Sequence, residues 1–278
     1  MLNEQASIAK LRWIMAQLRD PMTGCPWDIK QDFSSITSHT LEEAYEVVDA
    51  IEQGDFIELE KELGDLLFQV IFYSQLGQEQ DYFNFDSVVE AICEKLIRRH
   101  PHVFAKADLK TDAEIKANWE NEKANERQKR NQQVANDSDG DNLSILADIP
   151  KNLPALSQAA KIQKRCAHVG FDWHNMQDVF AKIEEEMQEV KEEIEAQSIE
   201  RNALAEELGD LMFAVVNLCR HAKEDPETLL RRANQKFTKR FQGVEEQVNK
   251  SGKCFSAHDL AELENYWQQV KQQEKGQS

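Results

Sequence analysis

The sequence predicts an all-α protein built from two copies of one helical module. Apolar residues recur at helical spacing, as in Ile8, Leu11, Ile14, Met15 and Leu18, and no segment shows sustained two-residue alternation. A short acidic motif also occurs twice with one change, as Glu62-Leu-Gly-Asp-Leu-Leu-Phe68 and as Glu207-Leu-Gly-Asp-Leu-Met-Phe213. A motif repeated in a helical chain indicates a tandem duplication.

The starts of several predicted helices carry recognisable capping residues. Thr111 stands three residues before Glu114, which is the spacing of a capping box. Asp225 precedes a proline, which predicts an N-cap followed by the first helical position, and Ser256 is predicted as a further N-cap. With the apolar runs, these signals predict roughly five helices in each half.

The repeat extends beyond the acidic motif and sets the predicted domain boundaries. A Glu-Glu-x-x-Glu run precedes each copy, a basic run follows it, and a Trp with a Lys four residues later stands near the end of each half. A polar stretch with little to bury lies between the halves. We therefore predict an N-terminal helical domain (residues 1–123), a polar linker (124–153) and a C-terminal helical domain (154–278).

Composition limits the functional classes. The formal net charge is -18, which argues against binding to a nucleic acid polymer, because such binding relies on Lys and Arg. The five cysteines contain no C-x-x-C pair, so neither a disulfide framework nor a zinc site is expected. No stretch is long and apolar enough to span a membrane, and the first residues do not resemble a signal peptide. These features predict a soluble, cytoplasmic protein without membrane contact.

The acidic residues of each module predict a metal site. Residues three apart on a helix share a face, so two such pairs on successive helices bring four carboxylates together. Their mutual repulsion calls for a cation, and oxygen-only ligands suit Mg²⁺, with Mn²⁺ as an alternative. No glutamate has a histidine three residues later, which argues against a di-iron bundle. The predicted ligands are Glu186, Glu189, Glu207 and Asp210 in the second module and Glu43, Glu46, Glu62 and Asp65 in the first.

A solvated helix face is the other interpretation of these acids. Exposed helical glutamates are common, but here apolar residues surround the motif in both copies. Gly64 and Gly209 lie within the motif, and glycine in mid-helix suggests the close approach of a neighbour or ligand. The embedded, repeated motif therefore favours a site.

Taken together, the motifs resemble a known family. The acidic motifs, Cys25-Pro-Trp-Asp28, the run from Arg98 to Phe104 and Val169-Gly-Phe-Asp-Trp173 closely resemble the two-domain bacterial MazG nucleoside triphosphate pyrophosphohydrolases, over nearly the whole chain except the linker. The resemblance implies tandem all-α modules, a homodimer, and Mg²⁺-dependent hydrolysis of a nucleoside triphosphate to the monophosphate and diphosphate. It implies the same metal ligands in the second module, and nucleotide contacts from Lys182, Lys236, Arg240 and Trp267. The internal repeat adds Lys271 and the first-module positions Lys95, Arg99, Trp119 and Lys123.

Roles within this site follow from charge. Glu185 or Glu186 would accept the proton of the attacking water, and the sequence leaves both open. Lys236 and Arg240, four residues apart, would meet the departing diphosphate, whereas Trp267 would either stack on the base or belong to the core. Lys182 stands four residues before Glu186 where His39 precedes Glu43, so we expect the C-terminal half to carry more of the turnover.

Three functions fit these residues. The first is the pyrophosphohydrolase, which would cleanse the nucleotide pool or act under stress. The second is a related all-α hydrolase of another nucleotide pyrophosphate, such as a phosphoribosyl or alarmone substrate. The third is a non-catalytic, metal-binding dimeric regulator. Product analysis separates the first two, and turnover of any triphosphate excludes the third.

Overall fold

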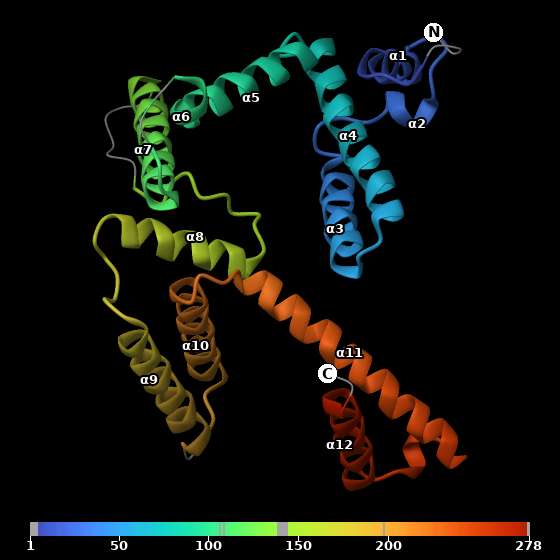
Figure 1. Cartoon of the computed structure of the whole chain (residues 1–278), viewed down its shortest axis with the longest axis vertical. Helices are drawn as coiled ribbons and strands as arrows, with labels where there is room; N and C mark the ends of the chain where they lie inside the picture. The colour runs from blue at the N-terminus through green and yellow to red at the C-terminus, as the bar shows by residue number, and fades with distance from the viewer. Residues whose placement is uncertain (1–4, 106, 108, 138–143, 197, 277–278) are drawn as a thin grey trace. The chain divides into compact units, whose positions relative to one another are not determined.

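The computed structural model confirms the all-α prediction (Figure 1). It describes residues 5–105, 107, 109–137, 144–196 and 198–276, and these contain helices but no strand. The chain divides into two compact units, Met1–Gln128 and Lys129–Ser278. Each unit contains one hairpin of two long helices that carries the acidic motifs.

The described residues of the N-terminal unit form seven helices, the last of which runs past the boundary of the unit. Their bounds are α1 (Ile8–Leu18), α2 (Pro26–Ile29), α3 (Thr37–Gln53), α4 (Phe56–Glu79), α5 (Phe85–Arg99), α6 (Pro101–Phe104) and α7 (Asp112–Asp137). α1 packs against α4. Met15 of α1, Ile71, Phe72 and Leu76 of α4, and Ile36 just before α3 form one core. This core supports the α3–α4 hairpin from one end of α4.

The α3–α4 hairpin closes through a short turn with favourable residues at both positions. Gly54 caps α3 with φ 72°, in the left-handed region where a side chain would be strained. Asp55 then caps α4, because its carboxylate accepts from the backbone N–H groups of Ile57 and Glu58. The tight turn makes α3 and α4 run side by side (Figure 1).

The C-terminal unit repeats the hairpin and adds a second one. Its elements are α8 (Ala155–His168), α9 (Met176–Glu195), α10 (Arg201–His221), α11 (Pro226–Ser251), the short 3₁₀ helix η1 (Phe255–Ala257) and α12 (Leu260–Gly276). α9 packs along α10, and α12 packs along α11 (Figure 1). Val244, Val248 and Val270 form the core of the α11–α12 hairpin, with Leu263, Tyr266 and Trp267 against it.

Two of the three predicted helix starts are confirmed. Glu114 N donates to Thr111 Oγ1 at 3.2 Å while Thr111 N donates to Glu114 Oε2 at 2.9 Å, which is a reciprocal capping box. Asp225 caps α11 by accepting from Thr228 N. The prediction for Ser256 is wrong, because this residue lies inside η1. Asp259 takes the capping role for α12, since its carboxylate accepts from Glu262 N at 2.8 Å.

The predicted linker begins within a helix. α7 continues to Asp137, because the residues after Ala124 are mostly good helix formers without Gly or Pro. The centre of the predicted linker, residues 138–143, lies outside the described residues. Within the described part of the chain, no helix is long and apolar enough to cross a bilayer.

Candidate functional site

The C-terminal unit brings three predicted metal ligands together across the α9–α10 hairpin. Glu186 on α9 meets Glu207 and Asp210, which stand three apart on one face of α10. One carboxylate oxygen of each lies within 4.8 Å of the others. We call these residues the C-terminal cluster.

The N-terminal unit repeats this arrangement. Glu43 on α3 meets Glu62 and Asp65 on α4, again with one oxygen from each within 4.8 Å of the others. These are the duplicated counterparts of the C-terminal residues, and we call them the N-terminal cluster. The same geometry at both copies follows from the same spacing on two hairpins.

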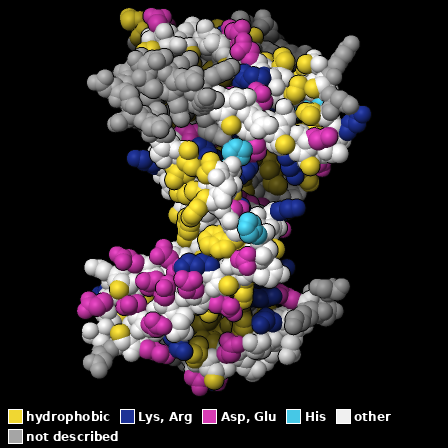
Figure 2. All heavy atoms as spheres, turned by 90° about the vertical axis from the view of Figure 1, so that its left-hand side faces the viewer, with side chains coloured by type: hydrophobic (Ala, Val, Ile, Leu, Met, Phe, Trp, Pro, Cys, Tyr) yellow, Lys and Arg dark blue, Asp and Glu magenta, His cyan; other side chains and the backbone are white. Residues whose placement is uncertain are grey.

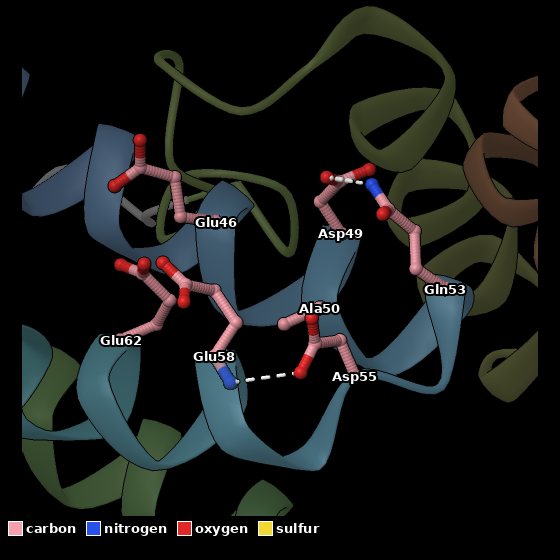
Figure 3. Close-up of a pocket in the computed structure, with 7 residues that line it drawn as sticks. All are labelled: Glu46, Asp49, Ala50, Gln53, Asp55, Glu58 and Glu62. Atoms are coloured by element: carbon pink, nitrogen blue, oxygen red, sulfur yellow. Dashed lines mark hydrogen bonds between the residues drawn. The ribbon is translucent and has the colours of Figure 1, made fainter.

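The fourth predicted acid of each module lies at the margin of its cluster. Neither Glu46 nor Glu189 belongs to the groups within 4.8 Å. Glu46 nevertheless interacts electrostatically with Glu43 and Glu62, and Glu189 does so with Glu207. Figure 3 shows the Glu46 carboxylate on α3 facing the same space as that of Glu62 on α4.

Burial and mutual repulsion perturb both clusters. Desolvation, followed by the charge of Asp65, raises the pKa of Glu43 above its ordinary value. Desolvation and then the charge of Glu46 raise the pKa of Glu62. In the C-terminal cluster, desolvation and then the charges of Glu189 and Asp210 raise the pKa of Glu207. Carboxylates that resist ionisation beside one another are stabilised by a bound cation.

Glu186 is the buried member of the C-terminal cluster. The residue is 5% exposed, and its Oε1 lies 2.8 Å from Lys182 Nζ. Its Oε2 is buried and has no hydrogen-bond partner in the part of the chain that the structure describes. A buried carboxylate oxygen without a partner is costly, so this atom fits a cation ligand.

The donors of both clusters suit a hard divalent cation. Every side chain in them offers carboxylate oxygen, and neither cluster contains histidine or cysteine. Mg²⁺ and Mn²⁺ prefer such ligands. The residues present therefore fit the metal that the acidic motifs predict.

Among the described residues, no protein neighbour closely approaches the motif glycines. A Cβ atom built on Gly64 or Gly209 would meet no other atom within 4 Å. The space beside each glycine is open in the single chain, so no neighbouring residue requires a glycine at these positions.

Apart from Lys182 on α9, the predicted basic and aromatic contacts of the C-terminal unit lie on the other hairpin. Lys236 and Arg240 are on α11, whereas Trp267 and Lys271 are on α12. Arg240 Nε donates to Glu274 Oε2 at 2.8 Å, and its guanidinium carbon lies 6.0 Å from the Trp267 ring centroid. α11 packs mainly against α12, less against α8, and only slightly against α10. The structure therefore gathers these residues with one another, apart from the α9 carboxylates.

Trp267 packs as a half-buried aromatic residue. Its ring centroid lies 5.0 Å from that of Phe237, and the residue borders the valine core of the α11–α12 hairpin. Trp267 therefore borders the core, keeps part of its surface exposed, and has Arg240 over its ring.

In the N-terminal unit, the corresponding residues join α5 to α7. Lys95 and Arg99 lie on α5, and Trp119 and Lys123 lie on α7. Arg99 and Arg98 both pair with Glu126, while Lys123 pairs with Glu120 at 3.1 Å. The Trp119 ring meets His100 at 5.3 Å between centroids. The contacts of Glu126 and Trp119 hold the end of α5 against α7, whereas the Lys123 pair lies within α7.

The Glu126 ion pairs predict an acid-sensitive stability. Hydrogen bonds from Arg99 hold the pKa of Glu126 at about 2, below the ordinary 4.5. The folded state therefore binds this proton less readily than the unfolded state, so the stabilisation is complete above about pH 4.5 and is lost as the pH falls toward 2. After allowance for solvent screening, we expect about 1 kcal/mol. Urea unfolding measures the free energy of unfolding across this pH range. As the pH falls, Glu126→Gln should lose less of this free energy than the unaltered protein, and the same dependence on pH in both proteins would contradict the assignment.

Sequence reasoning missed an acidic pocket beside the N-terminal cluster (Figure 3). The pocket has a volume of about 210 Å³ and is lined by Glu46, Asp49, Ala50, Gln53, Asp55, Glu58 and Glu62. The available signal was Glu58, which stands one helical turn before Glu62 and shares its face. The second module has Ala203 at the corresponding position, so the two sites differ here.

Acidic side chains also cover the surface around the C-terminal cluster. Figure 2 shows acidic side chains gathered in the lower part of the view, and α9 contributes Glu184, Glu185, Glu192 and Glu195 as exposed residues. This surface attracts cations and repels polyanions unless a cation accompanies them.

Comparison with known proteins identifies the family. The MazG nucleotide pyrophosphohydrolase domain matches twice, at residues 31–104 and 174–249, which include both carboxylate hairpins. The chain is 48% identical to the nucleoside triphosphate pyrophosphohydrolase of Escherichia coli K12, over 96% of this chain and 98% of that protein. It is 38% identical to the nucleoside triphosphate pyrophosphohydrolase/pyrophosphatase MazG of Thermotoga maritima, over 93% of each. The chain is a member of the MazG nucleotide pyrophosphohydrolase family.

Proposed function

We propose that this protein hydrolyses nucleoside triphosphates to the monophosphate and diphosphate at its carboxylate clusters, with Mg²⁺ or Mn²⁺ as cofactor. The observation that carries the proposal is the unpartnered, buried Oε2 of Glu186 within a group of three converging carboxylates. Membership of the family and the names of the two relatives support the reaction.

The proposed ligands are the three acids of each cluster, with Glu189 and Glu46 completing the two sets. When bound, the cation neutralises phosphate charge and makes a water molecule more acidic. Glu185 is exposed and lies outside the C-terminal cluster, so it remains able to accept the proton of the attacking water. Glu186 is committed to the cluster by its burial.

Basic residues would hold the phosphates. Lys182 extends from α9 beside Glu186, so its ammonium group is close enough to the cluster to contact a bound triphosphate. Lys236 is exposed on α11, where it is available to a diphosphate group. Because the α11–α12 hairpin stands apart from the α9 carboxylates, we propose that its basic residues reach a substrate through assembly or hairpin movement.

A homodimer is the proposed assembly. The helices of the C-terminal carboxylate hairpin leave large apolar side chains exposed in the single chain, namely Phe180, Met187, Leu208, Met212, Phe213 and Val215. Burial of such a surface is the usual driving force for association. A second copy offers the same surface and would complete a helical bundle, and sedimentation equilibrium would measure the assembly. We place this enzyme in the cytoplasm, where nucleoside triphosphates are used.

The products test the proposed reaction. With Mg²⁺ and a panel of natural and damaged nucleoside triphosphates, we expect the nucleoside monophosphate and inorganic diphosphate in equal amounts, because cleavage lies between the α and β phosphates. Ion-exchange chromatography measures the nucleotides, and a coupled assay separates diphosphate from orthophosphate. Stoichiometric orthophosphate with the nucleoside diphosphate would exclude this reaction. Turnover confined to a nucleotide with a different pyrophosphate linkage would favour the related hydrolase.

A further inference from the structure

Lys182 neutralises the buried acid of the C-terminal cluster. Its Nζ lies 2.8 Å from Glu186 Oε1 and 2.8 Å from Glu185 Oε1. The Lys182 side chain is 34% exposed, whereas that of Glu186 is 6% exposed. A buried carboxylate without a counter-charge is strongly unfavourable, so the lysine stabilises the ionised Glu186 in the absence of a metal.

The same carboxylate is a proposed metal ligand. Lys182 occupies Oε1, and the other oxygen of Glu186 has no partner among the described residues. An ammonium group and a divalent cation on one carboxylate repel each other at short range. The lysine therefore opposes metal binding at Glu186, and its flexible four-carbon stem permits it to withdraw when a metal binds.

The N-terminal module lacks this arrangement. His39 stands where the second module has Lys182, and its Nδ1 contacts Glu42 Oε2 at 3.4 Å rather than Glu43. Both side chains of that pair are well exposed, at 41% and 61%. The two modules thus share their carboxylates but differ in the cation beside them.

We propose that Lys182 is a built-in counter-cation that competes with the divalent metal for Glu186 and, once displaced, contacts the phosphates of the substrate. This inference rests on the proposed metal site. Lys182 would then weaken the binding of the metal to the free enzyme and strengthen the binding of a triphosphate to the metal-loaded enzyme. A lysine that acted only in folding, or only as a phosphate ligand, would not produce these opposite effects.

Calorimetric titration with Mg²⁺ alone tests the first effect. The full-length chain should carry Glu62→Gln and Asp65→Asn, so that the C-terminal cluster is measured by itself. In this background we expect Lys182→Met to lower the dissociation constant for Mg²⁺ by about fivefold, as befits loss of a partly exposed ion pair. An unchanged or higher dissociation constant would overturn the proposal.

Lys191→Met is the matched control for net charge. Lys191 lies on the same helix, two residues after Glu189 and hence on its opposite side, and it pairs with Glu195 at 3.8 Å. We expect its variant to change the dissociation constant less than about twofold, as for an exposed surface charge. Equal tightening in both lysine variants would overturn the specific role of Lys182.

A triphosphate analogue that resists hydrolysis tests the second effect. At saturating Mg²⁺, Lys182→Met should bind the analogue about tenfold more weakly, since a charge-assisted contact is lost. Circular dichroism checks the fold, and Lys182→His, which copies the first module, replaces the methionine variant if that variant does not fold. Absence of Mg²⁺ binding in the background protein itself would instead reject the metal site, so the two failures are distinguishable.

Discussion

Glu62→Gln combined with Glu207→Gln is expected to lower triphosphate turnover at least about 100-fold, because each change removes one carboxylate from a metal cluster. Both clusters must be altered together, since the duplication provides a site in each half. The fold should persist, because both glutamates are only partly buried and glutamine has nearly the same shape. Steady-state kinetics with circular dichroism measure the two results.

The matched control alters adjacent acids on the same helices. Glu60 on α4 and Glu206 on α10 are exposed and lie outside the clusters. Glu60→Gln with Glu206→Gln makes the same change in net charge and should leave turnover within about twofold, as expected for substitutions of exposed surface residues. Chelation by EDTA should abolish activity of the unaltered protein, and Mg²⁺ should restore it. Full activity of the cluster variant would show that these carboxylates form only a solvated face.

Glu189→Gln is expected to lower turnover about tenfold more than Glu46→Gln in the full-length protein. The two acids are duplicated counterparts at the margins of their clusters. One difference between the halves is Lys182, a permanent cation beside Glu186, where the first module has His39 beside Glu42. The hydrogen bonds that Lys182 donates to Glu185 and Glu186 raise the pKa of this lysine, which keeps it charged.

Single-mutant kinetics at saturating Mg²⁺ decide this ranking. The N-terminal site also has the additional acid Glu58 beside it, which increases the repulsion of a polyanion. A larger loss from Glu46→Gln would make the N-terminal half the principal catalyst and would reverse the order.

Local signals in the sequence were sufficient to predict the fold class. They also picked out the three acids that converge in each module, together with a fourth, Glu46 or Glu189, that lies at the margin. Helical spacing predicted the helices of the α3–α4 and α9–α10 hairpins. Two acids three apart share one face of such a helix, which predicted that the carboxylates of each hairpin meet. Capping residues three positions from their partners located the starts of α7 and α11. These features depend only on neighbours in the chain.

Contacts between distant segments could not be predicted in this way. The spacing of Lys236 and Trp267 does not reveal that their hairpin packs on its own valine core, apart from the α9 carboxylates. Helix propensity explains why α7 extends to Asp137. The predicted linker rested instead on the polarity of the segment, which does not distinguish an exposed helix from a coil. The wrong cap at Ser256 shows a related difficulty, because Asp259 offered the better acceptor three residues later.

Direct measurement of metal binding tests the central claim, that the paired carboxylate hairpins hold divalent cations. Titration with Mn²⁺, followed by electron paramagnetic resonance of the free ion, should show binding to the unaltered chain without nucleotide. Replacement of all six cluster acids by their amides should abolish this binding while the helical signal in circular dichroism remains. Retention of Mn²⁺ binding with unchanged affinity in that folded variant would contradict the account.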